Sequence, residues 1–374
     1  MIEYLNDEEQ LILEAVREFR EREIDGKKTD PHELPRDLVK KAGELGFYGL
    51  TTPEEYGGAD VSCVCYAAVI EELAKTPSVM PTIFNQQNGA ARMIAKYSTP
   101  AQKEKFLQRT LSGELLQGLS VSEPVGATNY PEWAEIGHTE GDEVVLNGSK
   151  IYLTLGRECG SVLLNCKIDG KRQMVFVDID DPGVVLGERV THLGGDSQTG
   201  MCTIDFNDVH VPKEDIFPGE SLASDITNSI SYLNMAALAL GNARGIYEKT
   251  LEYVSNRERY GKPLASFQKV AHKLVDMRTT LDVAEVWIAD TARRVDEGKG
   301  EMIRFFQAKS WIPEACFNIV NECIVLHGGL GLDEECGLGE YQALAEKTLL
   351  MERPADIHRD MVASLMGLPV DFRW

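Results

Sequence analysis

A glutamate that could act as a base lies near the end of the chain, in the stretch LLMERPADIHR (349–359). Glu352 follows three apolar residues and precedes the pair Arg353–Pro354. A carboxylate enclosed by apolar side chains has a raised pKa and can act as a general base near neutral pH. The same glutamate on a solvated helix face would be an ordinary surface carboxylate, and its immediate neighbours do not decide between the two.

The glycine-rich stretch LHGGLG (326–331) is a second candidate, because paired glycines let the backbone approach a ligand or a neighbouring element closely. The sequence contains no G-x-G-x-x-G fingerprint, P-loop, H-E-x-x-H or G-x-S-x-G motif. Eight cysteines are scattered, and only Cys63 and Cys65 are close together. This spacing disfavours a zinc or iron–sulfur site and predicts free thiols in a reducing cytoplasm, with no metal.

The charge balance excludes some classes of partner. The 38 basic and 60 acidic residues give a net charge of −22, which argues against nucleic acid and against anionic membrane surfaces. No run of 18 apolar residues predicts a membrane-spanning helix, and the acidic start MIEYLNDEEQ lacks a signal-peptide pattern. We therefore expect a cytoplasmic protein.

Hydrophobic periodicity divides the chain into three predicted domains: 1–117 helical, 118–221 β and 222–374 helical. In the first, Asn6 and Glu9 form the pattern of a capping box before an apolar helical series. Further helices are predicted over 38–47, 64–74, 80–97 and 100–111.

The middle domain shows a period of two. Asn147–Gly148 and Asp169–Gly170 each separate two apolar runs, which predicts two β-hairpins. Apolar residues alternate with polar ones from Cys202 to Phe206, as in a half-buried strand.

The last domain reads as four long helical segments, which suggests an antiparallel bundle. The predicted fold is therefore mainly α with a central β domain, and it lacks the βαβ alternation of a nucleotide-binding sheet. The four segments are 232–252, 266–297, 301–326 and 339–366.

With this order in view, the local motifs resemble those of the acyl-CoA dehydrogenase family over essentially the whole chain. The resemblance implies an N-terminal helical domain, a barrel-like β domain and a C-terminal four-helix bundle. The motifs that carry it are PEEYGG (53–58), EELAK (71–75), STPAQKEKFL (98–107), LSVSEP (119–124), LNGSKIYLT (146–154), FNDVHVP (206–212), NRERYGKPLASFQ (256–268) and LHGGLG (326–331).

The resemblance also implies an activity. The family oxidises acyl-CoA thioesters to α,β-enoyl-CoA with FAD, usually as a tetramer, and passes electrons to an electron-transfer flavoprotein. Glu352 matches the family's catalytic base on the last helical segment, with Leu349, Leu350 and Met351 as an apolar wall. The residues matched to FAD-binding positions are Ser122, Tyr152 and Thr154 near the flavin ring, and Arg257, Gln268, Gly328 and Gly329 toward the pyrophosphate and adenine side.

Candidate substrate contacts follow from the same resemblance. Thr128 could offer a hydroxyl to CoA, and Tyr232 stands where the family has an arginine. Gln86 and Gln87 lie on the helix that usually lines the acyl pocket, so they could bind a polar or cyclic acyl group or simply form an exposed helix turn.

Several departures from the family pattern leave the function open. The family's Gly-Thr after the glutamate is replaced by Arg353–Pro354, and proline fixes the backbone there. One hypothesis is a divergent dehydrogenase. A second is a non-catalytic or cofactor-completing partner subunit of a mixed oligomer, and a third is a flavoenzyme that reduces an enoyl-CoA or eliminates a β-leaving group. The assembly is expected to be a homo- or hetero-tetramer.

Overall fold

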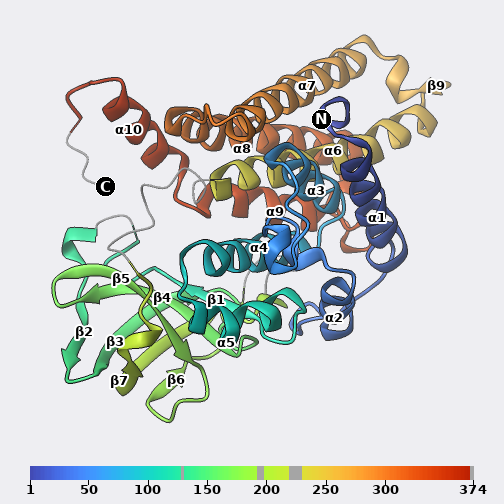
Figure 1. The fold of residues 1–374 in the computed structure, drawn as a ribbon. Coiled ribbons are helices and arrows are strands. Elements are labelled where there is room, and N and C mark those ends of the chain that lie inside the picture. Colours follow the sequence, from blue (N-terminus) through green and yellow to red (C-terminus); the bar gives the residue numbers. More distant parts are fainter. Residues whose placement is uncertain (128–129, 192–197, 219–229, 371–374) are drawn as a thin grey trace. The chain divides into compact units, whose positions relative to one another are not determined.

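The computed structural model describes residues 1–127, 130–191, 198–218 and 230–370. In chain order, a helical N-terminal region and a helical C-terminal region precede and follow a curled sheet, which confirms the predicted fold class (Figure 1). The chain divides into two compact units. Unit 1 comprises Met1–Lys27, Ser62–Pro81 and Ser229–Phe372, and unit 2 comprises Lys28–Val61, Thr82–Asn228 and Arg373–Trp374. This division runs through the helical N-terminal region, so the three domain boundaries stay a prediction.

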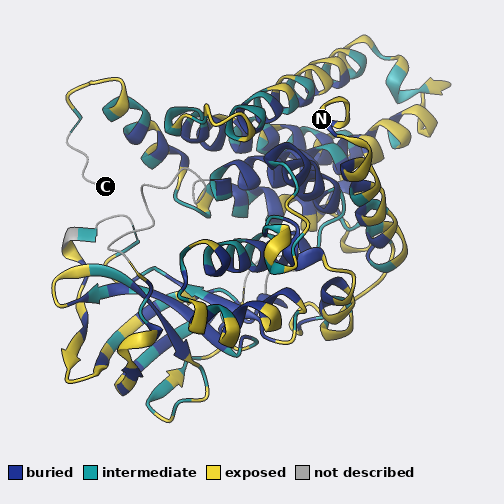
Figure 2. Ribbon diagram, viewed as in Figure 1, coloured by how far each residue is buried: buried dark blue, intermediate teal, exposed yellow. Residues whose placement is uncertain are grey.

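Unit 1 is helical. The predicted capping box opens its first helix: the Oδ1 atom of Asn6 accepts from the amide of Glu9 at 2.9 Å, and the Glu9 carboxylate accepts from the amide of Asn6 at 3.1 Å. Every residue of α3 is buried (Figure 2). The helices are α1 (Asp7–Glu23), α3 (Cys63–Ala74), α6 (Ile230–Asn256), α7 (Gln268–Asp296), α8 (Met302–His327), α9 (Leu338–Leu350) and α10 (Ala355–Leu365), with a short hairpin of β8 (Glu258–Arg259) and β9 (Lys262–Pro263) between α6 and α7.

Helix α8 packs against four other helices of this unit, α6, α7, α9 and α10. By length and composition alone, Met302–Leu332 is apolar enough to cross a membrane. The core helix of a soluble bundle meets the same criterion, and α8 carries a fully buried charged residue, Lys309, that bonds to neighbouring backbone.

The last predicted helical segment is interrupted, which corrects the prediction for 339–366. Helix α9 ends at Leu350, and α10 begins only at Ala355. Glu352 and Arg353 both adopt positive φ, at 54° and 76°. Pro354 disfavours helical geometry in the residue before it and has no amide hydrogen to donate, so the chain turns here.

Helices α3 and α6 approach closely at two glycines one turn apart. A Cβ atom on Gly241 would lie 2.1 Å from the carbonyl oxygen of Glu71, and one on Gly245 would lie 1.9 Å from that of Lys75. Both obstacles are backbone atoms, which cannot move away without shifting a helix.

We therefore expect Gly245→Ala to force the two helices apart and to lower the free energy of unfolding by about 1–3 kcal/mol. Urea unfolding at constant pH measures it. The matched control is Gly339→Ala in α9, where no atom lies within 4 Å of the added Cβ. That substitution is expected to be neutral or stabilising by up to about 1 kcal/mol. Equal effects of the two substitutions would contradict the close approach of the helices.

Unit 2 contains a seven-stranded sheet of order β1-β4-β2-β3-β7-β6, in which β5 pairs with the other edge of β4. Its aromatic core stacks Phe176 on Phe106 at 4.0 Å and on Phe217 at 4.6 Å between ring centroids. The helices are α2 (Arg36–Glu44), α4 (Met80–Tyr97) and α5 (Pro100–Leu111), and the strands are β1 (Gln117–Ser120), β2 (Glu135–Glu140), β3 (Glu143–Leu153), β4 (Ser161–Ile168), β5 (Lys171–Asp178), β6 (Val184–Leu186) and β7 (Cys202–Pro212).

One of the two predicted hairpins is confirmed. Asp169 and Gly170 join the antiparallel strands β4 and β5, and their φ angles of 51° and 77° suit a tight two-residue turn. The Asn147–Gly148 hairpin is wrong, because β3 runs through both residues without turning. The Asn147 side chain instead accepts from the amide of Asp208, at an irregularity in the pairing with β7. The long pairing with β7, which continues beyond this irregularity, outweighs the local turn preference.

The cysteines are confirmed as free thiols: all eight are unpaired, and seven are buried. The alternating strand at Cys202–Phe206 is also confirmed, since its apolar residues are buried and those between them half-buried.

Candidate functional site

The predicted base lies in the turn between α9 and α10, not on a helix as the sequence suggested. Glu352 is half-buried, and its Oε2 atom accepts a hydrogen bond of 3.5 Å from the hydroxyl of Ser231 on α6. The left-handed conformations of Glu352 and Arg353 cost about 1–2 kcal/mol each for non-glycine residues. Surrounding contacts must offset this strain.

Lys309 on α8 supplies some of these contacts. Its side chain is 0% exposed, and its Nζ atom donates to the carbonyl oxygens of Thr348 at 2.9 Å and Arg353 at 3.2 Å. Burial lowers the pKa of Lys309 to about 8, against the opposing attraction of the Glu352 charge. These two hydrogen bonds place the Lys309 ammonium group against the turn. Because its pKa is about 8, the group carries a charge at neutral pH.

His358 on α10 holds the other side of the turn. Its Nε2 atom lies 2.8 Å from the carbonyl oxygen of Glu352, and because a carbonyl only accepts, Nε2 donates. The ring packs edge-on against Tyr232, 5.0 Å away between centroids, and beside Phe306 at 5.6 Å. Burial lowers the pKa of His358 to about 4, so the imidazole is neutral at pH 7.

Glu352 is therefore an unusual carboxyl group. Burial raises its pKa, whereas the charges of Lys309 and Arg353 and the Ser231 hydroxyl act in the opposite direction. The guanidinium of Arg353 lies 3.4 Å from the sulfur of Met361. The predicted apolar wall needs a correction, because Leu350 is 64% exposed; the enclosing groups come from α6, α8 and α10. A carboxylate in this setting can accept or return a proton.

The buried histidine predicts acid sensitivity. The pKa of His358 is about 4 in the folded chain and about 6.5 when the ring is exposed. At a pH between these two values, the imidazole is therefore protonated in the unfolded state and neutral in the folded state. Stability is therefore lost as the pH falls from 6.5 to 4, by at most about 3 kcal/mol from this group. His358→Gln is expected to flatten that part of a stability profile measured by urea unfolding. The control is His138→Gln, at a side chain that is 51% exposed, and its stability should fall with pH as steeply as that of wild type. If stability fell equally steeply in His358→Gln and in wild type, the prediction would be contradicted.

Three residues matched to the flavin ring come together in unit 2. The amide of Ile151 donates to the carbonyl oxygen of Ser122 at 2.8 Å, which joins the segment after β1 to the end of β3. Thr154 pairs with Leu119 through an isolated bridge. Tyr152 lies between Ile151 and Thr154 in the sequence; its side chain is 58% exposed and its φ angle is 54°. An exposed aromatic ring beside two hydroxyl residues suits a planar aromatic ligand.

A buried ion pair that the sequence interpretation missed supports this edge. Lys150 and Glu123 are 0% and 2% exposed, and their charged atoms are 2.9 Å apart. Lys150 also donates to the carbonyl of Val121 at 3.0 Å and lies 4.0 Å from the centre of the Trp133 ring. Both charged residues belong to motifs that carry the resemblance, LSVSEP and LNGSK, which was the available signal. The pair fixes the loop that presents Ser122.

The two glutamines of α4 bind backbone. Gln86 donates to the carbonyls of Gln117 at 2.7 Å and Thr154 at 3.2 Å. Gln87 is 0% exposed, and its amide nitrogen and oxygen both bond to the backbone of Gln117. Full burial and these bonds to backbone do not favour Gln87 as a contact to an acyl group, whereas Gln86 is only half-buried. Thr128 lies outside the described residues.

The remaining candidates are on unit 1. Arg257 follows α6, Gln268 opens α7, and Gly328 and Gly329 follow α8; all four are exposed in the single chain. Gly328 has φ at 64° and ψ at −138°, a conformation open essentially only to glycine. No atom lies within 4 Å of a Cβ built on either glycine, so the backbone here is open to a ligand. These features fit the diphosphate and adenine side of FAD.

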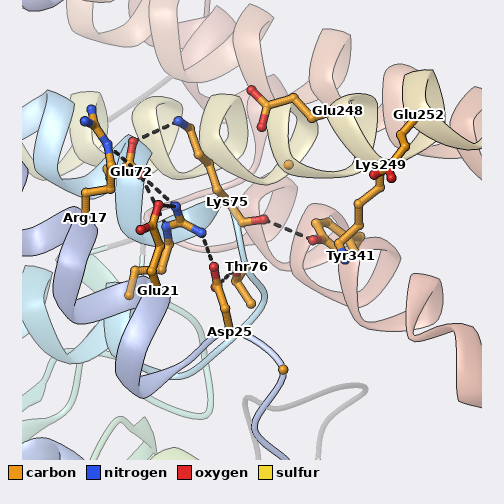
Figure 3. Close-up of a pocket in the computed structure, with 13 residues that line it drawn as sticks. Arg17, Glu21, Asp25, Glu72, Lys75, Thr76, Glu248, Lys249, Glu252 and Tyr341 are labelled. Atoms are coloured by element: carbon orange, nitrogen blue, oxygen red, sulfur yellow. Dashed lines mark hydrogen bonds and ion pairs between the residues drawn. The ribbon is translucent and has the colours of Figure 1, made fainter.

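A cavity of about 480 Å³ between α1, α3, α6 and α9 has a different character. Several of its charged residues are paired with one another: Glu72 bonds to Arg20 at 3.0 Å and to Lys75 at 2.8 Å (Figure 3). The hydroxyl of Tyr341 donates to the backbone of Lys75 at 3.0 Å. None of the predicted site residues lines this cavity, and the ion pair of Arg20 with Glu72 joins α1 to α3. Within the described ranges, no three His, Cys, Asp or Glu side chains are grouped as metal ligands.

Comparisons with known proteins identify the family of the chain. The model of the acyl-CoA dehydrogenase N-terminal domain matches residues 6–114, and that of the acyl-CoA dehydrogenase C-terminal domain matches 230–366. A 3-(aryl)acrylate reductase of Clostridium sporogenes is 27% identical and covers 96% of this chain and 99% of its own. The caffeyl-CoA reductase-Etf complex subunit CarC of Acetobacterium woodii is also 27% identical, covering 89% of this chain and 91% of its own.

A solved structure extends the similarity to the fold. Butyryl-CoA dehydrogenase from Megasphaera elsdenii has a TM-score of 0.90 and 25% identity, covering 97% of this chain and 99% of its own. Both terminal domain models and these full-length similarities point the same way. The chain belongs to the acyl-CoA dehydrogenase family of flavoprotein oxidoreductases.

Proposed function

We propose that this chain catalyses FAD-dependent α,β-dehydrogenation of an acyl-CoA thioester, with Glu352 as the base. The observation that carries the proposal is a carboxyl group with a burial-raised pKa, on a turn held from two sides by Lys309 and His358. Such a carboxylate can remove the weakly acidic α-proton of a thioester. As it does so, the Glu352 charge is neutralised, which removes the unfavourable desolvation of the carboxylate.

The chain's other residues bind and orient. When bound, FAD supplies the redox chemistry by accepting a hydride from the substrate β-carbon. Ser122, Tyr152 and Thr154 would hold its ring side. Arg257, Gln268, Gly328 and Gly329 would hold its pyrophosphate and adenine side, in a tetramer whose electrons pass to an electron-transfer flavoprotein. The relative whose printed name includes an Etf complex supports that partner. We also propose a cytoplasmic location.

The substrate is proposed to carry a polar or cyclic acyl group. Gln86 and Tyr232 remain the described candidates to contact it, with Thr128 toward CoA. The names of two relatives, a 3-(aryl)acrylate reductase and a caffeyl-CoA reductase, support an aromatic acyl group.

The same names favour a second function, reduction of an enoyl-CoA. In that direction Glu352 would give its proton to the α-carbon, and a raised pKa keeps the proton available for this role. Oxidation and reduction would use the same site. Oxidation would need Glu352 as the carboxylate, and reduction would need it as the protonated acid.

A visible spectrum of the purified protein tests the proposal. We expect a bound flavin spectrum that bleaches anaerobically on addition of butyryl-CoA or 3-phenylpropionyl-CoA. Bleaching by neither, together with reoxidation of dithionite-reduced flavin by crotonyl-CoA or cinnamoyl-CoA, would indicate the reductive function. A colourless protein that gains flavin only with a related chain would indicate a partner subunit.

A further inference from the structure

We propose that Lys309 and His358 are positioning residues that hold the Met351–Pro354 turn in its left-handed conformation and thereby aim the Glu352 carboxylate. The inference rests on the proposed function of Glu352 and assigns the parts that make it work. Neither residue is proposed to touch the substrate.

The hydrogen bonds show how the turn is held. Three carbonyl oxygens around it accept from buried side chains: Thr348 and Arg353 from Lys309, and Glu352 from His358. The donors come from two different helices, α8 and α10, so the turn is bonded from two sides. The amide of Met351 continues the helical pattern by donating to Lys347. The carboxylate-bearing residue is thus fixed at its own carbonyl and at the next one.

The need for this support follows from the sequence of the turn. Glu352 and Arg353 both have a Cβ atom at positive φ, where glycine would be free of strain. Pro354 removes a donor that could have closed the turn by itself. Buried side-chain donors therefore take the place of a glycine and of a backbone hydrogen bond.

Lys309 has a second effect, through charge. The groups that face the Glu352 carboxyl are Lys309 from α8, Arg353 from the turn, Ser231 from α6 and, through the Glu352 carbonyl, His358 from α10. The Lys309 ammonium lowers the pKa of Glu352 against the stronger effect of burial. Removing that cation should raise the pKa of Glu352 further.

The test variant is Lys309→Met, which keeps the length of the side chain while removing its charge and its two hydrogen bonds. We expect kcat at pH 7 with the thioester that bleaches the flavin to fall about tenfold, with KM nearly unchanged. The acidic limb of the kcat profile should move to higher pH by about one unit. The control is Lys299→Met, which removes an exposed lysine of the same unit that is paired with Glu297. It should leave the pH profile of kcat unchanged.

An infrared titration provides a readout that does not depend on turnover. The carboxyl band of Glu352, isolated as the difference between wild type and Glu352→Gln, should titrate at higher pH in the Lys309→Met background. A lysine with a merely structural role would lower thermal stability without moving this titration. An unchanged carboxyl titration and an unchanged acidic limb would overturn the inference.

A rescue variant tests the positioning itself. Arg353→Gly removes one residue's strain at positive φ, so the double variant Lys309→Met/Arg353→Gly should recover part of the kcat lost in Lys309→Met. Its acidic limb should lie at still higher pH, because the Arg353 cation that lowers the pKa of Glu352 is lost as well. No recovery in a correctly folded double variant would contradict the positioning role. If Glu352→Gln is fully active, the proposed function fails. If Glu352→Gln is inactive but Lys309→Met behaves like wild type, only this inference fails.

Discussion

Glu352→Gln is expected to lower the rate of flavin reduction by a saturated acyl-CoA by about 10³-fold or more, while the protein keeps its bound flavin. The amide has nearly the same shape as the carboxyl group but cannot accept the α-proton, and general-base catalysis contributes about 10²–10⁴ in rate. Stopped-flow absorbance of the flavin band measures the rate.

The matched control is Glu340→Gln, which removes an exposed carboxyl group from the first turn of α9. It should reduce flavin at the wild-type rate. Glu352→Gln with undiminished activity would show that another group takes the α-proton. Equal losses in both variants would point to a general effect of charge on this unit.

Lys150→Met is expected to destabilise unit 2 by about 3–5 kcal/mol, because it leaves the buried Glu123 carboxylate without its cation. Glu123 retains one hydrogen bond, from the amide of Ala134 at 2.8 Å, which cannot replace a charge. Since this pair holds the loop of Ser122, we also expect flavin to be released more readily. Urea unfolding and the flavin content after gel filtration measure the two effects.

The double variant Lys150→Met/Glu123→Leu tests whether the loss comes from the unpaired charge. It should be more stable than Lys150→Met alone, since neither charge remains buried. The control Lys105→Met breaks an ion pair with Asp215 in which the lysine is 57% exposed. Its effect should stay within about 1 kcal/mol. Additive losses in the double variant would argue against the ion pair as the cause.

Local signals predicted much of the fold. The helix from Pro100 to Leu111 has the predicted bounds because Thr99 and Gln102 form a capping box around a proline at the first turn. Asp169–Gly170 turns the chain because nothing competes with its preference for positive φ. Asn147–Gly148 has the same preference, yet β3 pairs with β7 both before and after these residues, and that pairing outweighs it.

The candidate site was predicted less completely. Glu352 is a candidate because of its apolar neighbours and its motif, but Lys309 and Ser231, which bond to its turn, are distant in the sequence. Lys309 reaches carbonyls 39 and 44 residues away, and Lys150 pairs with a residue 27 positions away. Hydrophobic periodicity carries no information about such contacts. A lone lysine within the apolar α8 sequence was the one signal that could have identified Lys309.

The most direct test of Glu352 as the proton-transferring group is exchange of the substrate α-hydrogen with solvent deuterium. The purified protein is incubated anaerobically in D₂O with the thioester that bleaches its flavin, and the recovered thioester is analysed by NMR. Wild type should incorporate deuterium at the α-carbon, and Glu352→Gln should incorporate essentially none. Equal incorporation by both proteins would contradict the assignment of Glu352, whichever direction the redox reaction takes.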